Sequence, residues 1–250
     1  MHLRLNEWVA GSPLSAAVPA LRNREIQLWT AGVPASDEGL LEFNNLLAPA
    51  ERTRAARFSN PFARREFVFG RGFLRMLLGE CLRIEPGNLD FDTTAYGKPC
   101  LRPFSANRDL RFNLSHSGGR VVVALAFGRE LGVDLEWIQD LEDWPSLSAR
   151  IFSPRELAEL NALLPEQRRR AFFNGWTRKE AFLKATGEGL SDNLQAIEVS
   201  VTPGRPPEWL ALPGGPEVMC RWTVRDIPLS DGFAGALVYE NTKPLTSSRV

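Results

Sequence analysis

Two acidic residues alternate with apolar ones in residues 132–137, which read Gly-Val-Asp-Leu-Glu-Trp. On a β-strand, Asp134 and Glu136 would project from one face and the apolar side chains from the other. Two neighbouring carboxylates repel each other unless a cation or base lies between them, and oxygen ligands suit Mg²⁺. The spacing alone also fits an amphipathic strand with a solvated acidic face, which is the more frequent case.

A second acidic residue precedes a lysine by four positions in residues 176–184, Trp-Thr-Arg-Lys-Glu-Ala-Phe-Leu-Lys. On a helix, Trp176 and Leu183 would belong to the buried stripe, and Glu180 and Lys184 would lie beside it. Such a pair is also an ordinary ion pair along a helix, worth about 0.2–0.5 kcal/mol. Taken alone, the spacing favours the ordinary pair.

Hydroxyl groups surround one of the two histidines, His116, in residues 113–119, Asn-Leu-Ser-His-Ser-Gly-Gly. This composition can supply donors to a phosphate. A lone histidine is more often structural, and no Asp and Ser spacing here indicates a hydrolase triad. Residues 96–99, Tyr-Gly-Lys-Pro, place Lys98 in a turn, which by itself is a common loop.

Hydrophobic periodicity predicts the elements that carry these residues. The expected helices cover about 61–82, with interruptions at Gly70 and Gly72, and about 166–186, and the expected strands cover 121–127, 131–138, 196–201, 221–227 and 233–239. The strands at 121–127 and 131–138 are expected to pair as a hairpin. Ser153, Pro154 and Glu156 form the pattern of a capping box at a helix start.

An internal repeat divides the chain near Gly128. Residues 64–70 and 169–175 share the pattern Arg-Arg-x-Phe-x-x-Gly, and similar apolar strands, 124–127 and 235–239, follow them. A duplicated α+β unit explains both similarities. A pattern with four fixed positions can also arise by chance.

Composition excludes several classes of partner. The 250 residues are 44% hydrophobic and contain 30 Lys and Arg against 30 Asp and Glu, so no basic excess favours nucleic acid or an anionic membrane. No apolar run is long enough to span a bilayer. The three cysteines form no CxxC pair, which favours a reducing compartment. We therefore expect a cytoplasmic protein without nucleic acid or membrane partners.

The order of these segments is more informative than any one of them. The segments are, in order, Gly97-Lys98-Pro99, Phe112-Asn113-Leu114-Ser115-His116-Ser117, Gly132-Val133-Asp134-Leu135-Glu136, Phe152-Ser153-x-x-Glu156 and Trp176-x-x-Lys179-Glu180-Ala181-x-x-Lys184. Together they resemble the Sfp-type 4′-phosphopantetheinyl transferases over about residues 49–190. The last three segments are the most specific.

The resemblance implies an α+β fold of two similar halves with pseudo-twofold symmetry, with coenzyme A bound between them. The halves would be residues 1–127, which contact the nucleotide, and residues 128–250, which supply the metal and catalytic residues. The resemblance also implies a monomer with Mg²⁺, or Mn²⁺ in its place, as cofactor. The expected partners are coenzyme A and an apo acyl or peptidyl carrier protein.

The same resemblance implies roles for individual residues. Asp134, Glu136 and Glu180 match the Mg²⁺ ligands, and Lys184 matches a lysine that contacts the pyrophosphate. The residues that match contacts to the nucleotide, around the adenosine 3′-phosphate, are Arg54, Lys98, Pro99, Ser115 and His116. Glu156 also matches the family pattern, but its capping-box role explains it, so it is left out of the metal site.

The implied enzyme is a holo-carrier-protein synthase. In the reaction that the resemblance implies, a carrier serine hydroxyl would attack the β-phosphorus of coenzyme A and release adenosine 3′,5′-bisphosphate, with Glu180 as the base, directly or through a water. Two alternatives stay open: a noncatalytic paralogue that binds coenzyme A or a carrier protein, and another Mg²⁺-dependent phosphoryl-group enzyme. The presence of Asp134, Glu136, Glu180 and Lys184 argues against loss of catalysis.

Overall fold

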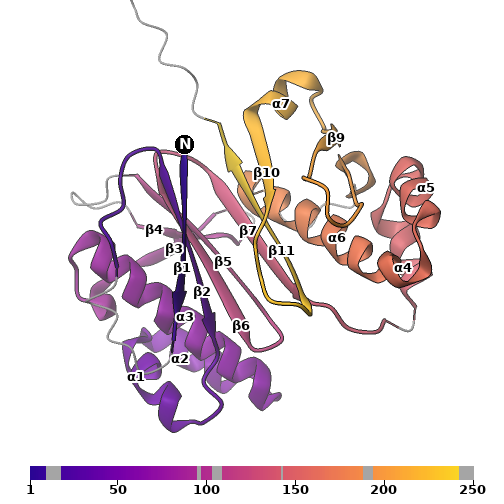
Figure 1. Ribbon diagram of the computed structural model, residues 1–250. Coiled ribbons are helices and arrows are strands. Elements are labelled where there is room, and N and C mark those ends of the chain that lie inside the picture. Colours follow the sequence, from indigo (N-terminus) through magenta and orange to yellow (C-terminus); the bar gives the residue numbers. More distant parts are fainter. Residues whose placement is uncertain (10–17, 95–96, 103–108, 142, 188–193, 242–250) are drawn as a thin grey trace, which may run out of the picture.

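Two β-sheets lie at the centre of the molecule, with helices on their outer faces (Figure 1). The computed structural model describes residues 1–9, 18–94, 97–102, 109–141, 143–187 and 194–241. The chain combines helices with sheets in which every strand pair but one is antiparallel within the described residues, so the predicted α+β class is confirmed. Within the described residues, no helix is both long and apolar enough to cross a membrane.

The first sheet has the strand order β1-β2-β6-β5. Its strands are β1 (His2–Trp8), β2 (Glu25–Gly32), β5 (Leu110–Ser117) and β6 (Arg120–Phe127). β1 is parallel to β2, and the other pairs are antiparallel. The helices on its outer side are α1 (Glu38–Leu46), α2 (Pro49–Ala56) and α3 (Pro61–Leu82).

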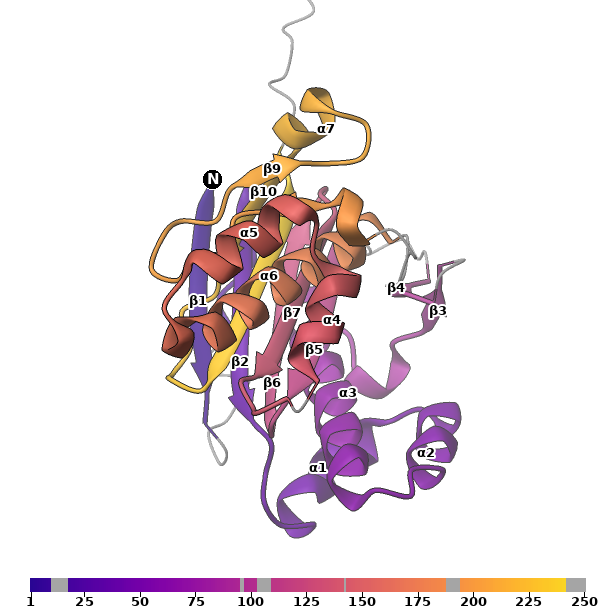
Figure 2. The same cartoon turned by 90° about the vertical axis from the view of Figure 1, so that its right-hand side faces the viewer.

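The second sheet has the order β10-β11-β7 and is covered by the long helix α6 (Figure 2). Its strands are β7 (Leu131–Trp137), β10 (Trp222–Asp226) and β11 (Phe233–Glu240). The helices of this half are α4 (Trp144–Ile151), α5 (Pro154–Ala162), α6 (Pro165–Thr186) and α7 (Pro216–Arg221). Two small hairpins complete the fold, β3 (Phe91–Thr93) with β4 (Pro99–Leu101) and β8 (Glu198–Val199) with β9 (Trp209–Ala211).

The two halves repeat one topology. In each, a strand is followed by a helix of 22 residues, a small hairpin and two further strands, the last of which lies between the other two. The first half gives the order β2-β6-β5 and the second gives β7-β11-β10. The repeated Arg-Arg-x-Phe-x-x-Gly segments lie on the equivalent helices α3 and α6. The prediction of two similar α+β halves is confirmed, while their separate functions stay a prediction.

The predicted hairpin between β6 and β7 is wrong. β6 pairs with β2 and β5, whereas β7 pairs with β11. Residues 128–130 instead carry the chain from one sheet to the other, and Gly128 adopts a φ of 63° at this turn. Residues 121–126 are buried on both faces, as expected of a central strand, which needs a partner on each side. Periodicity reveals a strand but not its partners.

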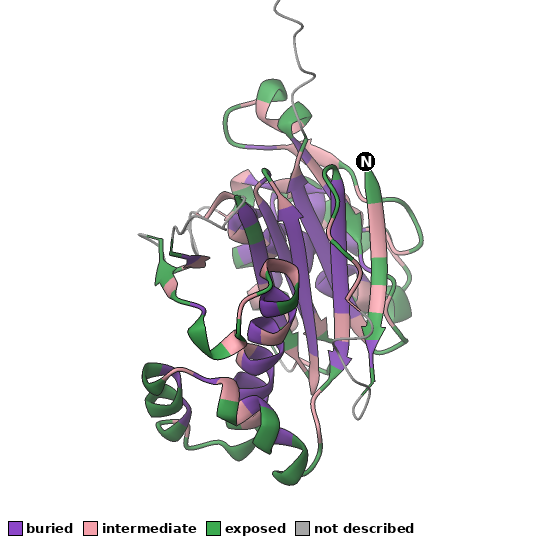
Figure 3. Cartoon of the chain, turned by 90° about the vertical axis from the view of Figure 1, so that its left-hand side faces the viewer, coloured by how far each residue is buried: buried purple, intermediate pink, exposed green. Residues whose placement is uncertain are grey.

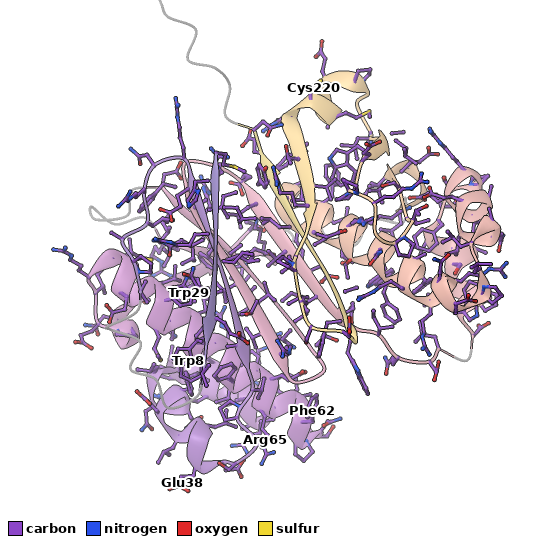
Figure 4. All side chains as sticks on the ribbon, viewed as in Figure 1. Trp8, Trp29, Glu38, Phe62, Arg65 and Cys220 are labelled. Atoms are coloured by element: carbon purple, nitrogen blue, oxygen red, sulfur yellow. The ribbon has the colours of Figure 1, made fainter. Side chains whose placement is uncertain are left out.

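The core has separate layers on the two sides of the first sheet. On the outer side, Trp8 and Trp29 pack with the aromatic residues of α1 and α3 (Figure 4). On the inner side, apolar residues of β2 and β6 pack against those of β7 and β11. The central strands are consequently buried along most of their length (Figure 3).

The predicted helix at 61–82 has the expected bounds, but the expected interruptions at Gly70 and Gly72 are wrong, because α3 is continuous. Gly72 has a packing role instead. A Cβ there would lie 2.8 Å from the Cα of Phe43, so the glycine allows α1 to lie directly against α3.

Candidate functional site

The acidic strand is β7, and its side chains alternate as the sequence predicts. Val133 and Leu135 are buried in the core between the sheets, and Asp134 is also buried, with 3% of its surface exposed. Glu136 is half-buried and Trp137 is exposed. The pair of carboxylates therefore does not lie on a solvated face, which removes the ordinary amphipathic strand as the explanation.

Gly132 allows α6 to approach β7 closely. A Cβ at this position would lie 2.2 Å from the carbonyl oxygen of Ala181 and 2.4 Å from the amide nitrogen of Ala185. No side chain fits at these distances, so only glycine permits this contact. The close packing places Glu180 and Lys184 of α6 beside the carboxylates of β7.

Lys184 forms an ion pair across the two elements. Its Nζ lies 2.6 Å from Asp134 Oδ1 and donates a second hydrogen bond to Ser115 Oγ at 3.2 Å. Lys184 thus pairs with Asp134 of β7. An ordinary ion pair along the helix would instead join Lys184 to Glu180. Tertiary packing therefore decides the partner of Lys184, rather than its spacing of four residues from Glu180.

Negative charge is left uncompensated in this cluster. Asp134 Oδ2 and Glu180 Oε1 are buried and have no hydrogen-bond partner among the described residues. Burial and the neighbouring Asp134 raise the pKa of Glu180 to about 7, although Lys184 opposes the shift. The pKa of Glu136 is raised by the same two causes. Excess anionic charge in a buried place is what a cation or a proton would stabilise.

The cluster fits a hard divalent cation in its donor type. Asp134, Glu136 and Glu180 offer only oxygen donors, which Mg²⁺ prefers, and two of the oxygens are unpartnered. In the described part of the chain, however, no group of three or more acidic, His or Cys side chains is already arranged to hold a metal. Lys184 is the cation that neutralises Asp134 Oδ1 in this arrangement.

Glu136 is held by two neighbours. Ser117 Oγ donates to one carboxylate oxygen at 2.9 Å, and Trp176 Nε1 of α6 lies 3.4 Å from the other. Trp176 is half-buried and packs against the apolar cluster that contains Phe172 and Phe173, while its ring nitrogen reaches the site. Helical periodicity predicts only that Trp176 belongs to the buried stripe of the helix, whereas in the structure it also donates a hydrogen bond to Glu136.

Lys98 comes directly before β4 in the chain, and its side chain reaches the start of β7. Its Nζ donates to Leu131 O at 3.0 Å and to Glu130 Oε2 at 3.3 Å, and burial lowers its pKa. Lys98 and Pro99 line a cavity of about 270 Å³ between the β3–β4 hairpin and the start of β5, together with Arg111. Tyr96, in the same predicted turn, lies outside the described residues.

His116 lies near the other end of β5. Its Nδ1 is 3.3 Å from Glu66 Oε2 of α3, and Glu66 Oε1 accepts a hydrogen bond from Gly119 N. Arg54 lies on α2 with its guanidinium over the ring of Phe67. The structure thus does not gather the predicted nucleotide contacts into one cluster, and their roles in binding stay predictions.

Glu156 has a structural role that goes beyond the predicted capping box. The box is confirmed, because Ser153 N donates to Glu156 Oε2 at 2.8 Å and Glu156 N donates to Ser153 Oγ at 3.3 Å. In addition, Lys179 Nζ lies 2.6 Å from the same carboxylate, and both side chains are fully buried. Sequence analysis missed this pair, since 23 residues separate its members and nothing local indicates their contact.

Comparison with known proteins identifies the family of this chain. The family model for the N-terminal region of 4′-phosphopantetheinyl transferases matches residues 32–127, and the model for the 4′-phosphopantetheinyl transferase superfamily matches residues 130–238. The 4′-phosphopantetheinyl transferase HetI of Nostoc is 40% identical over 206 residues, which are 80% of this chain and 86% of that protein. This chain belongs to the 4′-phosphopantetheinyl transferase family.

Two further members of the family show how far the similarity extends. A putative 4′-phosphopantetheinyl transferase of Synechocystis is 34% identical over 68% of each chain. The 4′-phosphopantetheinyl transferase Sfp of Bacillus subtilis is 28% identical over 66% of this chain and 71% of its own length. The boundary between the two family models falls at residues 127–130, where the chain passes from the first sheet to the second.

Proposed function

We propose that this protein transfers the 4′-phosphopantetheine group of coenzyme A to a serine hydroxyl of an apo carrier protein, in a reaction that depends on Mg²⁺. Membership of the family supports the reaction. The single observation that carries the mechanism is the cluster of the buried Asp134 and the half-buried Glu136 and Glu180 beside Lys184. We expect the protein to act as a cytoplasmic monomer.

The reaction breaks the phosphoanhydride bond of coenzyme A and forms a phosphoester bond to the serine. The serine oxygen attacks the β-phosphorus of coenzyme A, and the bond from that phosphorus to the bridging oxygen breaks. Adenosine 3′,5′-bisphosphate leaves with the bridging oxygen. The serine proton needs an acceptor, because a hydroxyl is a weak nucleophile at neutral pH.

Glu180 is the proposed acceptor of that proton. Its Oε1 is buried and unpartnered, so it has a free lone pair to receive a proton, directly or through a water. Burial and the charge of Asp134 raise the pKa of this carboxylate, which increases its affinity for a proton, and a cation held by the same carboxylate would oppose the increase.

Asp134, Glu136 and Glu180 would hold the cation, and Lys184 would donate to the pyrophosphate. A bound Mg²⁺, or Mn²⁺ in its place, supplies neutralisation of the charge that grows on the pyrophosphate oxygens. Lys184 is 31% exposed, so its ammonium group can reach a ligand outside the cluster. Lys98, Pro99, His116 and Arg54 are the proposed contacts to the nucleotide.

The test is incubation with coenzyme A, Mg²⁺ and a panel of apo carrier proteins, followed by measurement of carrier mass. A gain of one phosphopantetheine group that requires the divalent ion supports the proposal, and the panel identifies the carrier. Binding of coenzyme A without any mass gain would indicate a noncatalytic paralogue. Breakdown of coenzyme A without carrier modification would indicate a different phosphoryl-group enzyme.

A further inference from the structure

Side chains, rather than a backbone ladder, join the two halves of the fold. β5 and β7 belong to different sheets but lie side by side (Figures 1 and 2). Backbone N–H groups of β7 donate to side chains of β5 in three matched pairs: Val133 to Asn113 at 2.8 Å, Leu135 to Ser115 at 3.2 Å and Trp137 to Ser117 at 3.1 Å. Each pair is separated by 20 residues, so the strands run parallel in constant register.

We call the three contacts of Asn113, Ser115 and Ser117 with the backbone of β7 the seam. Its two serines also donate to the two carboxylates of β7. Ser115 Oγ lies 3.0 Å from Asp134 Oδ1, and Ser117 Oγ lies 2.9 Å from Glu136 Oε2. The spacing of two residues on β5 thus matches the spacing of two residues on β7. Each hydroxyl accepts from the backbone of one residue and donates to the carboxylate of the residue before it.

We propose that Ser115 and Ser117 are positioning residues, which hold Asp134 and Glu136 in the orientation that binds the divalent cation. This inference rests on the proposed function for the role of the carboxylates. A hydrogen bond to an ionised carboxylate is stronger than a neutral one and restricts its rotation. Less conformational entropy is then lost when the ion binds. The first half of the chain thereby orients acidic residues of the second half.

The hydrogen bonds of Ser115 distinguish this role from the nucleotide contact that the family resemblance implies. A hydroxyl has one donor and two lone pairs. Ser115 uses the donor on Asp134 and the lone pairs on Leu135 N and Lys184 Nζ. Only 6% of its surface is exposed. No hydrogen-bonding position is left for a phosphate oxygen.

Binding of Mn²⁺ alone, measured by calorimetry on the full chain, tests the proposal without need of a carrier protein. Ser115→Ala and Ser117→Ala should each weaken Mn²⁺ binding roughly tenfold or more, as expected for a lost hydrogen bond to a charged group. Asn113→Ala is the matched control, because Asn113 makes the same seam bond but has no carboxylate among its partners in the described part of the chain. It should leave Mn²⁺ affinity within about twofold while lowering the melting temperature comparably.

Ser117→Thr keeps the hydroxyl and should restore Mn²⁺ affinity. Unchanged affinity in both alanine variants, or an equal loss in Asn113→Ala, would overturn the proposal. A wild-type protein that binds no Mn²⁺, with or without coenzyme A, would overturn it as well. Failure to modify any carrier protein would count only against the proposed function, because ion binding is measured separately.

A second readout compares coenzyme A with dephospho-coenzyme A as substrates. At a saturating concentration of the divalent ion, a positioning role predicts that Ser115→Ala lowers kcat by the same factor for both, with little change in either KM. A contact to the 3′-phosphate predicts instead a raised KM for coenzyme A alone. The second result would return Ser115 to the nucleotide site and overturn the inference for that residue.

Discussion

The backbone of Gly132 lies so close to that of Ala181 that a Cβ on the glycine would be 2.2 Å from the alanine carbonyl oxygen. This contact joins the strand that carries Asp134 to the helix that carries Glu180. The geometry of the site therefore depends on the lack of a side chain at one position.

Gly132→Ala should separate α6 from β7 and cost stability and activity together. We expect a loss of about 1–3 kcal/mol or more in the free energy of unfolding, the usual cost of overpacking. Urea unfolding and a transfer assay measure the two effects. Gly32→Ala is the control, since nothing lies within 4 Å of a Cβ there. Wild-type stability in Gly132→Ala would contradict the close packing.

Glu180→Gln should abolish transfer while the protein still folds. The change keeps the side-chain volume but removes the charge and the proton acceptor, so the turnover should fall by a factor of about 100 to 10,000. Asp134→Ala should do nearly the same. Glu166→Gln, at an exposed position of the same helix, should be neutral. Near-normal turnover in a folded Glu180→Gln protein would remove α6 from the catalytic site.

His116→Ala should weaken binding of coenzyme A by about 1.5–3 kcal/mol, as expected for a hydrogen bond to a charged 3′-phosphate. Dephospho-coenzyme A should bind equally well to both proteins. Calorimetry with the two ligands makes the comparison, and His2→Ala at the exposed second histidine is the control. An equal loss for both ligands would mean that His116, paired with Glu66, is structural.

Removal of divalent ions should stop transfer without unfolding the protein. Chelation should leave the melting temperature of the ligand-free protein almost unchanged, because Lys184 already neutralises part of the acidic cluster. Coenzyme A should strengthen metal binding, since its pyrophosphate supplies further oxygens, and by linkage the metal should strengthen coenzyme A binding by the same factor. Full transfer in excess chelator would refute the metal mechanism.

Glu51→Gln should destabilise the fold at neutral pH and not at strongly acidic pH. Burial alone would raise the pKa of Glu51, but hydrogen bonds and charge from Arg75 and Arg71 lower it overall. A pKa that is lower in the folded than in the unfolded state stabilises the fold above the unfolded value of about 4.5, and this stabilisation is lost as the pH falls through the folded value.

The expected loss in Glu51→Gln is about 1–3 kcal/mol at pH 7, because two arginines lose a charged partner. Glu42→Gln, at an exposed position of α1, is the control. Urea unfolding at several pH values measures both variants. A difference in the free energy of unfolding between wild type and Glu51→Gln that is as large at strongly acidic pH as at pH 7 would contradict the assignment.

Sequence by itself determined the local features of this protein. Alternation at residues 132–137 placed Asp134 and Glu136 on one face of a strand, and the pattern around Ser153 placed a helix start. The internal repeat also indicated two similar halves. These features depend on residues close together in the chain, so their periodicity is visible without the fold.

Tertiary structure alone decided which elements meet. The sequence paired β6 with β7, but the fold pairs β7 with β11 and joins it to β5 through serine side chains. The fold likewise pairs Lys184 with Asp134 and Lys179 with Glu156. The physical reason is that strand pairing and helix packing are set by total burial across distant segments, which local spacing does not encode.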